Sequence, residues 1–438
     1  MPDKKRLLLI SYYFPPLGMG GVQRAAKFAQ YLPEYGWDVT VLTVRDIAYY
    51  ARDRSLLNDV KNVDIQRTGS LDPLRLAFLL SGRKNSIAAA AGTPSILSRI
   101  FRFIDRKLFV PDSKILWNGF AFRRAVKLVK TYRFSAVLST APPFSTHLLA
   151  MKIAKILKIP WIADFRDGWT TMDFLPPERK LYMKFHRYFE KKTIRKADTY
   201  LAVSQKILND LAKDSDTPDE RGILIYNGYD EQDFTQVPPD RSSFNLTFMG
   251  TVTKWADPSV FFKAIRAAAD LHKSMSEYLK INIVGNILDS RLIKTAGAYD
   301  LENKLIMTGY LEHKKAVELV CKSQVLLFPI TNLTSPGVIT GKLFEYCASG
   351  KPIVAYVPEG EASNLLREMR PDTHFCTENN YMETADYIKE RFLEWEQGSV
   401  DVLEEAKQLY KNPNFNRYTR RYQTGRVADI LNTLTQAI

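Results

Sequence analysis

The stretch "GKLFEYCASGKPIVAYV", residues 341–357, joins one helical segment to one strand-like segment. Its first half spaces apolar residues as a helix does, and Gly350 is typical of the position at which a helix ends. The run "PIVAYV" that follows is apolar almost throughout, as a strand is when helices cover both of its faces. The stretch therefore predicts a parallel sheet with helices packed on it.

The same alternation of apolar runs and helical segments extends over the first half of the chain. The strand candidates there are "RLLLISYYF" (6–14), "WDVTVLTV" (37–44), "VDIQRT" (63–68), "SAVLST" (135–140), "PWIADF" (160–165), "TYLAVS" (199–204) and "ILIYNG" (223–228). Segment 22–35 has helical spacing, and Gly36 is placed to end that helix. This pattern is typical of a doubly wound parallel sheet.

The alternation begins again after a polar, proline-containing stretch near residue 238. The strand candidates in this half are "FNLTFMG" (244–250), "LKINIVG" (279–285), "NKLIMTGYL" (303–311), "VLLFPI" (325–330) and "PIVAYV" (352–357), with helical segments such as 258–271 and 313–322 between them. We therefore predict an α/β protein of two Rossmann-like domains, 1–238 and 239–411, that face each other across a cleft. Residues 412–438 predict a basic helix that packs back on the first domain.

Composition and charge narrow the class of protein. The chain is 45% hydrophobic, as globular proteins are, and its net charge of +14 indicates an anionic partner. The odd number of cysteines argues against a disulfide framework and favours a reducing cytoplasm. The N-terminal run "LLLISYYF" predicts a first strand rather than a signal peptide, and no apolar run reaches the roughly 18 residues that span a bilayer.

A glycine-rich loop follows the first predicted strand. In "SYYFPPLGMGGVQRAAKF" the glycines Gly18, Gly20 and Gly21 lead into a helix. Such glycines let a backbone approach a ligand closely, and the free N–H groups at the start of a helix favour an anion. A tight turn alone is the alternative interpretation of these glycines.

A lysine and a glutamate share one face of the helix that opens near Thr340. Lys342 lies in the first turn, where the helix dipole disfavours a cation unless an anion is bound nearby. A phosphate held by the N–H groups of residues 337–341 would supply that anion, and Glu345 could then accept hydrogen bonds from ribose hydroxyls. Gly250 and Lys254, after the first strand of the second half, offer a second lysine for the same phosphates. In the alternative interpretation, Lys342 and Glu345 form an exposed pair and Lys254 is solvated.

Charged residues also follow the strand "PWIADF" in the first half. Asp164, Arg166 and Asp167 lie at its carboxyl end, where open α/β sheets bind their ligands. We expect at least one of them in the ligand site, although an Arg–Asp pair that braces the loop is the alternative. Asp214 and Asp216 form an Asp-x-Asp pattern, which resembles the ligands of a metal site. We predict instead that the two residues lie in a solvated loop.

Taken in order, these motifs resemble a GT-B glycosyltransferase of family 4, also called glycosyl transferases group 1, of the type that builds cell-surface polysaccharides. The segments that carry the resemblance are "FPPLGMGGVQR" (14–24), "DFRDGW" (164–169), "AVSQ" (202–205), "NGYD" (227–230), "GYLEHKKAVELV" (309–320) and "KLFEYCASGKPIVA" (342–355). The resemblance implies retaining transfer of a sugar from a nucleotide-diphosphate sugar to an acceptor hydroxyl. It implies no metal ion and no cofactor beyond the donor, a UDP- or GDP-sugar.

The resemblance also assigns roles to residues. The donor base would lie near Gly309 and Leu311, and the ribose on Glu345. The diphosphate would meet four positions of the chain, which are Lys254, Lys342, Gly20 and Gly21.

Two positions depart from the family pattern. Glycine stands at 337, where the family has the first of its paired glutamates, and Arg166 stands where it has a histidine. These departures leave open how the sugar hydroxyls are held.

Two cationic, partly apolar segments belong to the first half, 95–133 and 178–196. Their mixture of aromatic, aliphatic and basic residues favours peripheral contact with an anionic membrane, the inner face of the cell membrane for a cytoplasmic protein, and hence a lipid-linked acceptor. Ordinary core or solvated helices are the alternative. A GT-B sugar-nucleotide epimerase and a basic nucleic-acid-binding protein remain as other functions, although the sequence shows no nucleic-acid-binding module.

Overall fold

The structure is a computed structural model of the 438-residue chain. It describes residues 4–49, 51–80, 109–171, 180–215, 219–234, 240–332, 339–398 and 413–436.

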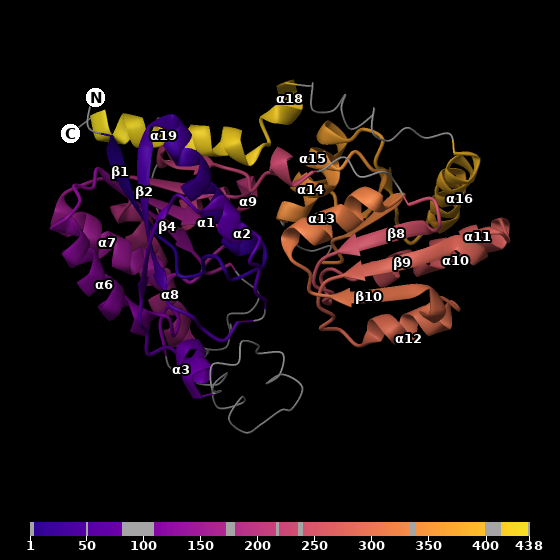
Figure 1. The fold of residues 1–438 in the computed structure, drawn as a ribbon, viewed down its shortest axis with the longest axis horizontal. Coiled ribbons are helices and arrows are strands. Elements are labelled where there is room, and N and C mark those ends of the chain that lie inside the picture. The colour runs from indigo at the N-terminus through magenta and orange to yellow at the C-terminus, as the bar shows by residue number, and fades with distance from the viewer. Residues whose placement is uncertain are drawn as a thin grey trace. The chain divides into compact units, whose positions relative to one another are not determined.

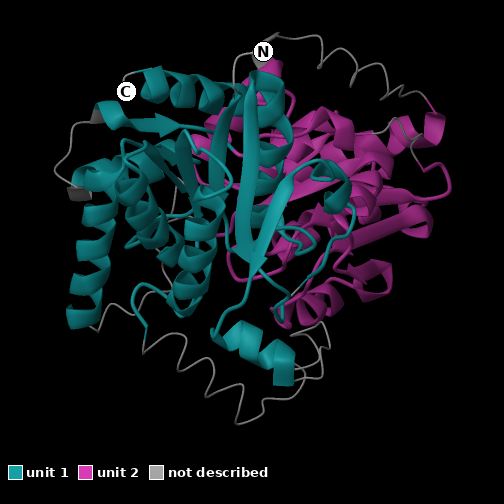
Figure 2. Ribbon diagram, turned by 60° about the vertical axis from the view of Figure 1, so that its left-hand side comes forward, with its two compact units in different colours: residues 1–226, 420–438 teal, residues 227–419 magenta. Residues whose placement is uncertain are grey.

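The chain divides into two compact units, each built around its own sheet (Figure 2). Unit 1 comprises residues 1–226 and 420–438, and unit 2 comprises residues 227–419. The sequence predicted domain boundaries at residues 238 and 411. In the structure the chain crosses from unit 1 to unit 2 before residue 238 and returns to unit 1 after residue 411. Tyr229 accounts for the earlier crossing: its backbone N–H donates to the Tyr418 carbonyl at 3.1 Å, and its ring lies 5.1 Å from that of Phe415. These contacts join the start of unit 2 to its end.

Unit 1 contains a parallel sheet with the order β3-β2-β1-β4-β5-β6-β7 (Figure 1). Its strands are β1 (Lys5–Ile10), β2 (Trp37–Val44), β3 (Asp64–Thr68), β4 (Ala136–Ala141), β5 (Trp161–Phe165), β6 (Thr199–Ala202) and β7 (Gly222–Leu224). Leu8 of β1 is in register with Thr40 on one side and Val137 on the other. The strands expected from the sequence in this half are confirmed.

The helices of unit 1 connect these strands. They are α1 (Gly20–Tyr31), α2 (Leu56–Asp59), α3 (Pro73–Leu80), α6 (Ile115–Val129), α7 (Ser145–Leu157), α8 (Lys180–Lys196), α9 (Gln205–Ser215) and α19 (Arg420–Gln436), with short 3-10 turns at Leu32–Tyr35 and Asp219–Arg221. The helix expected at 22–35 is α1 followed by one such turn, and it ends at Gly36, whose φ of 84° places it in the left-handed region.

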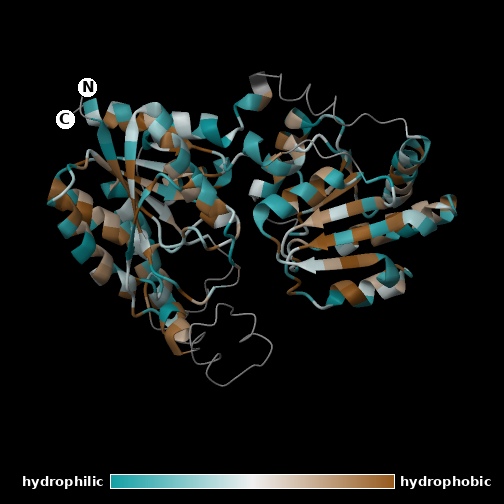
Figure 3. Cartoon of the chain, viewed as in Figure 1, coloured by the Kyte–Doolittle hydropathy of each residue, from teal (hydrophilic) through white to brown (hydrophobic). Residues whose placement is uncertain are grey.

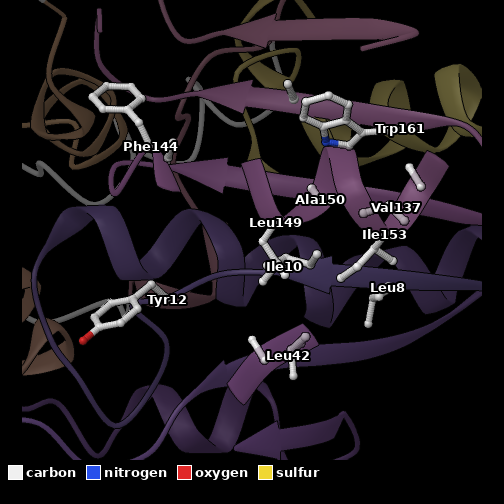
Figure 4. Packing of buried hydrophobic residues seen from close by; sticks show 14 of the residues in the cluster. Leu8, Ile10, Tyr12, Leu42, Val137, Phe144, Leu149, Ala150, Ile153 and Trp161 are labelled. Carbon is white, nitrogen blue, oxygen red and sulfur yellow. The ribbon is translucent and has the colours of Figure 1, made fainter. Parts of the chain in front are cut away.

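Strand β1 is buried on both faces, and its alternate residues enter different cores. Leu8 and Ile10 pack with Leu149 and Ile153 of α7 and with Trp161 of β5, as Figure 4 shows. Leu7 and Leu9 join the cluster on the opposite face, together with residues of α1 and α19. This burial explains why the first strand is apolar from Leu7 to Ile10.

The C-terminal helix α19 packs in unit 1 against α1. Val427, Ala428 and Leu431 are buried in the same cluster as Ala25 of α1. The indole N–H of Trp37 donates to Asn432 Oδ1 at 3.2 Å and anchors the helix to β2.

Unit 2 contains a second parallel sheet, with the order β10-β9-β8-β11-β12-β13. Its strands are β8 (Phe244–Met249), β9 (Leu279–Val284), β10 (Leu305–Gly309), β11 (Val325–Pro329), β12 (Ile353–Tyr356) and β13 (His374–Phe375). The strands expected from the sequence are present, and β13 is an addition because a two-residue strand leaves too short a pattern to detect.

The helices of unit 2 lie on the two faces of its sheet. They are α10 (Phe262–Leu271), α11 (Met275–Tyr278), α12 (Arg291–Ala298), α13 (His313–Lys322), α14 (Gly341–Ala348), α15 (Glu361–Met369), α16 (Tyr381–Gln397) and α18 (Pro413–Asn416), with 3-10 turns at Glu231–Asp233, Pro258–Phe261 and Glu302–Lys304. Figure 3 shows hydrophobic residues on β8 and β9 and hydrophilic ones on the outward side of α13 and α16.

Strand β8 alternates apolar and polar residues although it is buried on both faces. Phe244, Leu246 and Phe248 enter the core cluster with α10 and α16. Thr247 on the other face accepts from Asn282 at 3.2 Å and from Ser323 at 2.6 Å. Buried polar groups are tolerated where each finds such a partner.

Candidate functional site

Helix α14 begins where the strand order of unit 2 reverses. The sheet runs outward in both directions from β8 and β11, and α14 connects β11 to β12. Ligands of open α/β sheets bind at such a point, outside the carboxyl ends of the strands. The Tyr346 hydroxyl accepts from the Met249 backbone N–H at 2.6 Å. This bond fixes α14 beside the carboxyl end of β8.

Lys342 extends from the first turn of α14 over the backbone of Gly250. A Cβ atom at Gly250 would lie 2.9 Å from Cε and 3.3 Å from Nζ of Lys342, so a larger residue would displace the lysine. Gly285 is required for a similar reason, since its Cβ would lie 2.1 Å from the Gly250 carbonyl oxygen. Gly250 therefore makes room for the lysine, and Gly285 makes room for the backbone of Gly250.

The Lys342 ammonium forms no hydrogen bond or ion pair with any residue that the structure describes. The side chain is half-buried. Burial lowers the pKa of Lys342, and the nearby Glu345 carboxylate opposes this effect. A partly desolvated cation without a direct partner at a helix N-terminus fits a bound anion.

Glu345 lies one turn further along α14 and is buried, with 6% of its surface exposed. His313, the first residue of α13, places its Nε2 atom 3.7 Å from Glu345 Oε1. The same nitrogen lies 3.0 Å from Asp233 Oδ2. The pattern that predicted Glu345 did not predict these neighbours, because they come from distant parts of the sequence.

Three of the other positions expected to hold the donor, Lys254, Gly309 and Leu311, also lie in unit 2. Lys254 is exposed, and its ammonium lies 4.4 Å from the centre of the Trp255 ring. Thr331 binds the carbonyls of both residues, at 2.8 and 2.9 Å, and ties this loop to the end of β11. Gly309 has a φ of 67°, which favours glycine, and Leu311 is half-buried beyond it.

Two further predictions fall outside the described residues. They concern Gly337, four residues before α14, and Asp216 of the Asp-x-Asp pair. Among the residues that are described, no three His, Cys, Asp or Glu side chains are grouped so that they could hold a metal ion.

In unit 1, Arg166 connects the start of α1 to the ends of β4 and β5. Its guanidinium donates to the carbonyl oxygens of Gly21, Pro142 and Ala141. A Cβ atom at Gly21 would overlap this guanidinium, which explains the glycine at that position. Gly20 and Gly21 are the first residues of α1.

Asp164 is fully enclosed and bonded on both oxygens. Arg24 of α1 binds its carboxylate through Nε and Nη2, at 2.7–3.1 Å, and Thr140 donates to Oδ2 at 2.7 Å. With 0% of its surface exposed, Asp164 has the geometry of a brace between α1 and β5. Arg24 was not predicted; the available signal was a charge on the apolar face of the helix at 22–35.

Asp167 differs from its two charged neighbours. Its carboxylate is half-buried and forms no hydrogen bond or ion pair within the described residues. Burial raises the pKa of Asp167, and Arg166 partly opposes this. Among the three charged residues at the end of β5, Asp167 therefore differs in having no such partner among the described residues.

The loop that carries these residues is anchored to helix α8. The Trp169 indole N–H donates to His186 Nδ1 at 2.9 Å, and Thr170 donates to Glu190 through its hydroxyl at 2.6 Å and its N–H at 3.1 Å. Burial lowers the pKa of His186 to about 4, so the ring is neutral and can accept the indole proton at neutral pH.

A cavity of about 700 Å³ lies at the other end of the unit 1 sheet. Its lining includes Lys5 at the start of β1, Ser135 before β4 and Ile159 before β5. It therefore opens at the amino ends of the strands, away from Asp167.

Two family models match consecutive parts of the chain. Glycosyltransferase Family 4 matches residues 19–233, and Glycosyl transferases group 1 matches residues 231–412. A curated relative, an uncharacterised glycosyltransferase of Methanocaldococcus jannaschii, is 30% identical over 245 residues. That match covers 52% of this chain and 58% of the relative.

Solved structures share the fold over nearly the whole chain. HepE of Anabaena, solved in complex with UDP and glucose, is 14% identical with a TM-score of 0.60 and covers 98% of this chain and 100% of its own. A glycosyltransferase from Rickettsia africae is 14% identical with a TM-score of 0.63 and covers 99% of both chains. The two parallel sheets and these matches define the GT-B fold. The chain belongs to the family 4-like glycosyltransferases, glycosyl transferases group 1.

Proposed function

We propose that this chain transfers a sugar from a nucleotide-diphosphate sugar to an acceptor hydroxyl. The observation that carries the proposal is Lys342, whose half-buried ammonium lies beside Gly250 at the start of α14 without a hydrogen bond or ion pair to the described residues. A diphosphate would supply the missing anion, and the free N–H groups of the helix start would share its charge.

The same arrangement suits the chemistry of sugar transfer. As the bond between the sugar and the diphosphate breaks, negative charge grows on the leaving phosphate. A fixed cation aimed at that phosphate stabilises the transition state more than the ground state. We assign this role to Lys342, with Lys254 as a second contact and Glu345 as the acceptor of ribose hydroxyl protons.

Several finer points rest on the family resemblance. These are retention of configuration, independence of metal ions, the contact of the diphosphate with Gly20 and Gly21, and the place of the base near Gly309 and Leu311. UDP is the first nucleotide to test, because HepE was solved with it.

For the acceptor we propose Asp167, whose carboxylate has no partner among the described residues and can orient a hydroxyl. Arg166 would hold the neighbouring loops in place, and Asp164 would brace the strand below them. Of the three charged residues that lie together in the sequence, one would therefore bind the ligand and two would support the surrounding structure.

We further propose that α8 brings unit 1 to an anionic membrane that carries a lipid-linked acceptor. Leu181, Phe185 and Tyr188 recur at helical spacing and are 68%, 50% and 56% exposed. Lys184 and Arg187 are exposed beside them. Exposed aromatic and aliphatic residues flanked by cations are typical of helices that lie in a membrane interface. Residues 95–108 of the other predicted segment lie outside the described residues, and no described helix is long and apolar enough to cross a bilayer.

Calorimetric titration with UDP, GDP and ADP, without metal ions, tests the donor site. We expect one nucleotide to bind wild type, and Lys342→Ala to weaken it about tenfold or more, as loss of a charge-assisted hydrogen bond does. Lys322→Ala, at the last residue of α13 where the ammonium pairs with Glu318, is the matched control. Equal binding by wild type and Lys342→Ala would contradict the proposal.

The same nucleotide sugar distinguishes transfer from epimerisation. An epimerase converts its nucleotide sugar without an acceptor. If the protein changes the configuration of the donor sugar when no acceptor is present, it is an epimerase and the transferase proposal is wrong. Salt-sensitive binding of nucleic acid without nucleotide binding would favour the third function considered from the sequence.

A further inference from the structure

His313 places one ring nitrogen between two carboxylates of unit 2. Its Nε2 lies 3.0 Å from Asp233 Oδ2 and 3.7 Å from Glu345 Oε1. The three residues come from the 3-10 turn at Glu231–Asp233, the first position of α13 and the middle of α14. Both His313 and Glu345 are more than nine-tenths buried.

The two contacts differ in kind. A carboxylate only accepts, so the short contact with Asp233 places a hydrogen on His313 Nε2 and directs it to Oδ2. At 3.7 Å the contact with Glu345 is too long for a hydrogen bond but is within ion-pair distance. Asp233 therefore fixes the tilt of the ring, and the ring presents its positive N–H edge to Glu345 Oε1.

A buried carboxylate needs such support because desolvation penalises its charge. Without the imidazole N–H between them, the Glu345 carboxylate would face the Asp233 carboxylate directly and would turn away from it. This change would weaken the acceptor that a ribose hydroxyl requires.

We propose that His313, held by Asp233, is a positioning residue that orients Glu345 toward the ribose of the donor. The inference rests on the proposed function, since it assumes that Glu345 meets a ribose. It assigns to this site a second carboxylate, Asp233, which acts through the histidine and does not itself touch the ligand.

The test compares ribonucleotides with their 2′-deoxy forms: UDP, GDP and ADP against 2′-deoxy-UDP, 2′-deoxy-GDP and 2′-deoxy-ADP. Wild type should bind its ribonucleotide about tenfold or more tightly than the 2′-deoxy form. This is the usual cost in affinity when a charged hydrogen-bond acceptor loses the hydroxyl that donates to it. His313→Leu, which keeps the bulk and removes the N–H, should lose that preference while it binds the deoxynucleotide as before. His313→Gln, which retains an N–H donor, should recover most of it.

Two controls separate the possible failures. His272→Leu, a histidine of unit 2 that contacts Ser274 and Phe392 rather than Glu345, should behave as wild type. Glu345→Gln should lose the ribose preference by itself. If Glu345→Gln loses it and a folded His313→Leu keeps it, the donor site stands and the role of His313 is wrong. If wild type binds no nucleotide, or binds both forms equally, the donor assignment and this inference both fall. Thermal unfolding of each variant shows that the protein is folded.

Discussion

The side chain of Lys342 lies across the backbone of Gly250, so closely that a Cβ atom at Gly250 would come within 2.9 Å of the lysine Cε. Gly250 directly follows strand β8, and Lys342 lies in the first turn of α14. The position of the ammonium therefore depends on the absence of a side chain at the residue after β8.

Gly250→Ala should displace Lys342 and weaken nucleotide binding several-fold. It should also lower stability, because the φ of Gly250 is 158° and the new Cβ would lie 3.0 Å from the buried Phe248 ring. Calorimetric titration with the nucleotide that binds wild type measures the effect. Gly119→Ala, on an exposed face of α6 where a Cβ meets nothing within 4 Å, is the control and should bind normally. Unaltered nucleotide binding by Gly250→Ala would show that the position of Lys342 does not depend on Gly250.

Nucleotide affinity should fall at alkaline pH, beginning below the ordinary lysine pKa of 10.5. Burial lowers the pKa of Lys342 in the free protein, and only the protonated form attracts a diphosphate. Affinity is therefore complete below this lowered pKa and is lost as the pH rises through it. Lys342→Arg stays charged over the whole range, so its affinity should follow only the titration of the nucleotide. Parallel profiles for the two proteins between pH 7 and 10 would show that Lys342 does not meet the phosphates.

Asp164→Asn should destabilise the protein strongly. The change leaves Arg24 buried opposite a neutral group, and breaking a buried ion pair in this way costs about 3–5 kcal/mol. Urea unfolding measures the loss. Asp270→Asn breaks the exposed pair between Arg266 and Asp270 and should cost about 1 kcal/mol or less. A stable Asp164→Asn protein that has lost activity would instead point to a direct role in catalysis.

Asp167→Asn should reduce the turnover number about tenfold or more, through the lost charge-assisted hydrogen bond to the acceptor. Nucleotide affinity should stay the same. Because burial raises the pKa of Asp167 above its unfolded value, the ionised carboxylate lowers stability at neutral pH. The variant should therefore be as stable as wild type or more so, and urea unfolding at pH 7 checks this. Strong destabilisation would mean that Asp167 braces the loop.

The double variant Leu181→Glu and Phe185→Glu should lose binding to vesicles that contain anionic lipid. Both side chains are exposed on α8, and each contributes up to about 1.5–3 kcal/mol when buried in an interface. Co-sedimentation at low salt measures the change. Ile293→Glu, at an exposed position of α12 in unit 2, should bind as wild type does. Equal binding by wild type and the double variant would show that α8 is an ordinary solvated helix.

Local sequence patterns were sufficient for most of the fold. Helix α13 begins and ends at the predicted residues, His313 and Lys322, because its apolar spacing ends at a clear boundary. Strand β8 was also predicted, although its polar residues Asn245 and Thr247 need partners from β9 and from Ser323. The sequence pattern did not predict that unit 2 begins before residue 238. That boundary depends on contacts of Tyr229 with residues far along the chain.

The sequence by itself determined the two parallel sheets, the start of α14 and the presence of Lys342, Glu345 and Asp167 near strand or helix ends. These features follow from periodicity and from glycine positions, which act over a few residues. The tertiary structure decided which charges have partners: Asp164 is bound by Arg24, Arg166 by backbone carbonyls, and Glu345 lies beside His313. Those partners are far apart in the sequence, and the desolvation that makes such pairing matter exists only after the chain has folded.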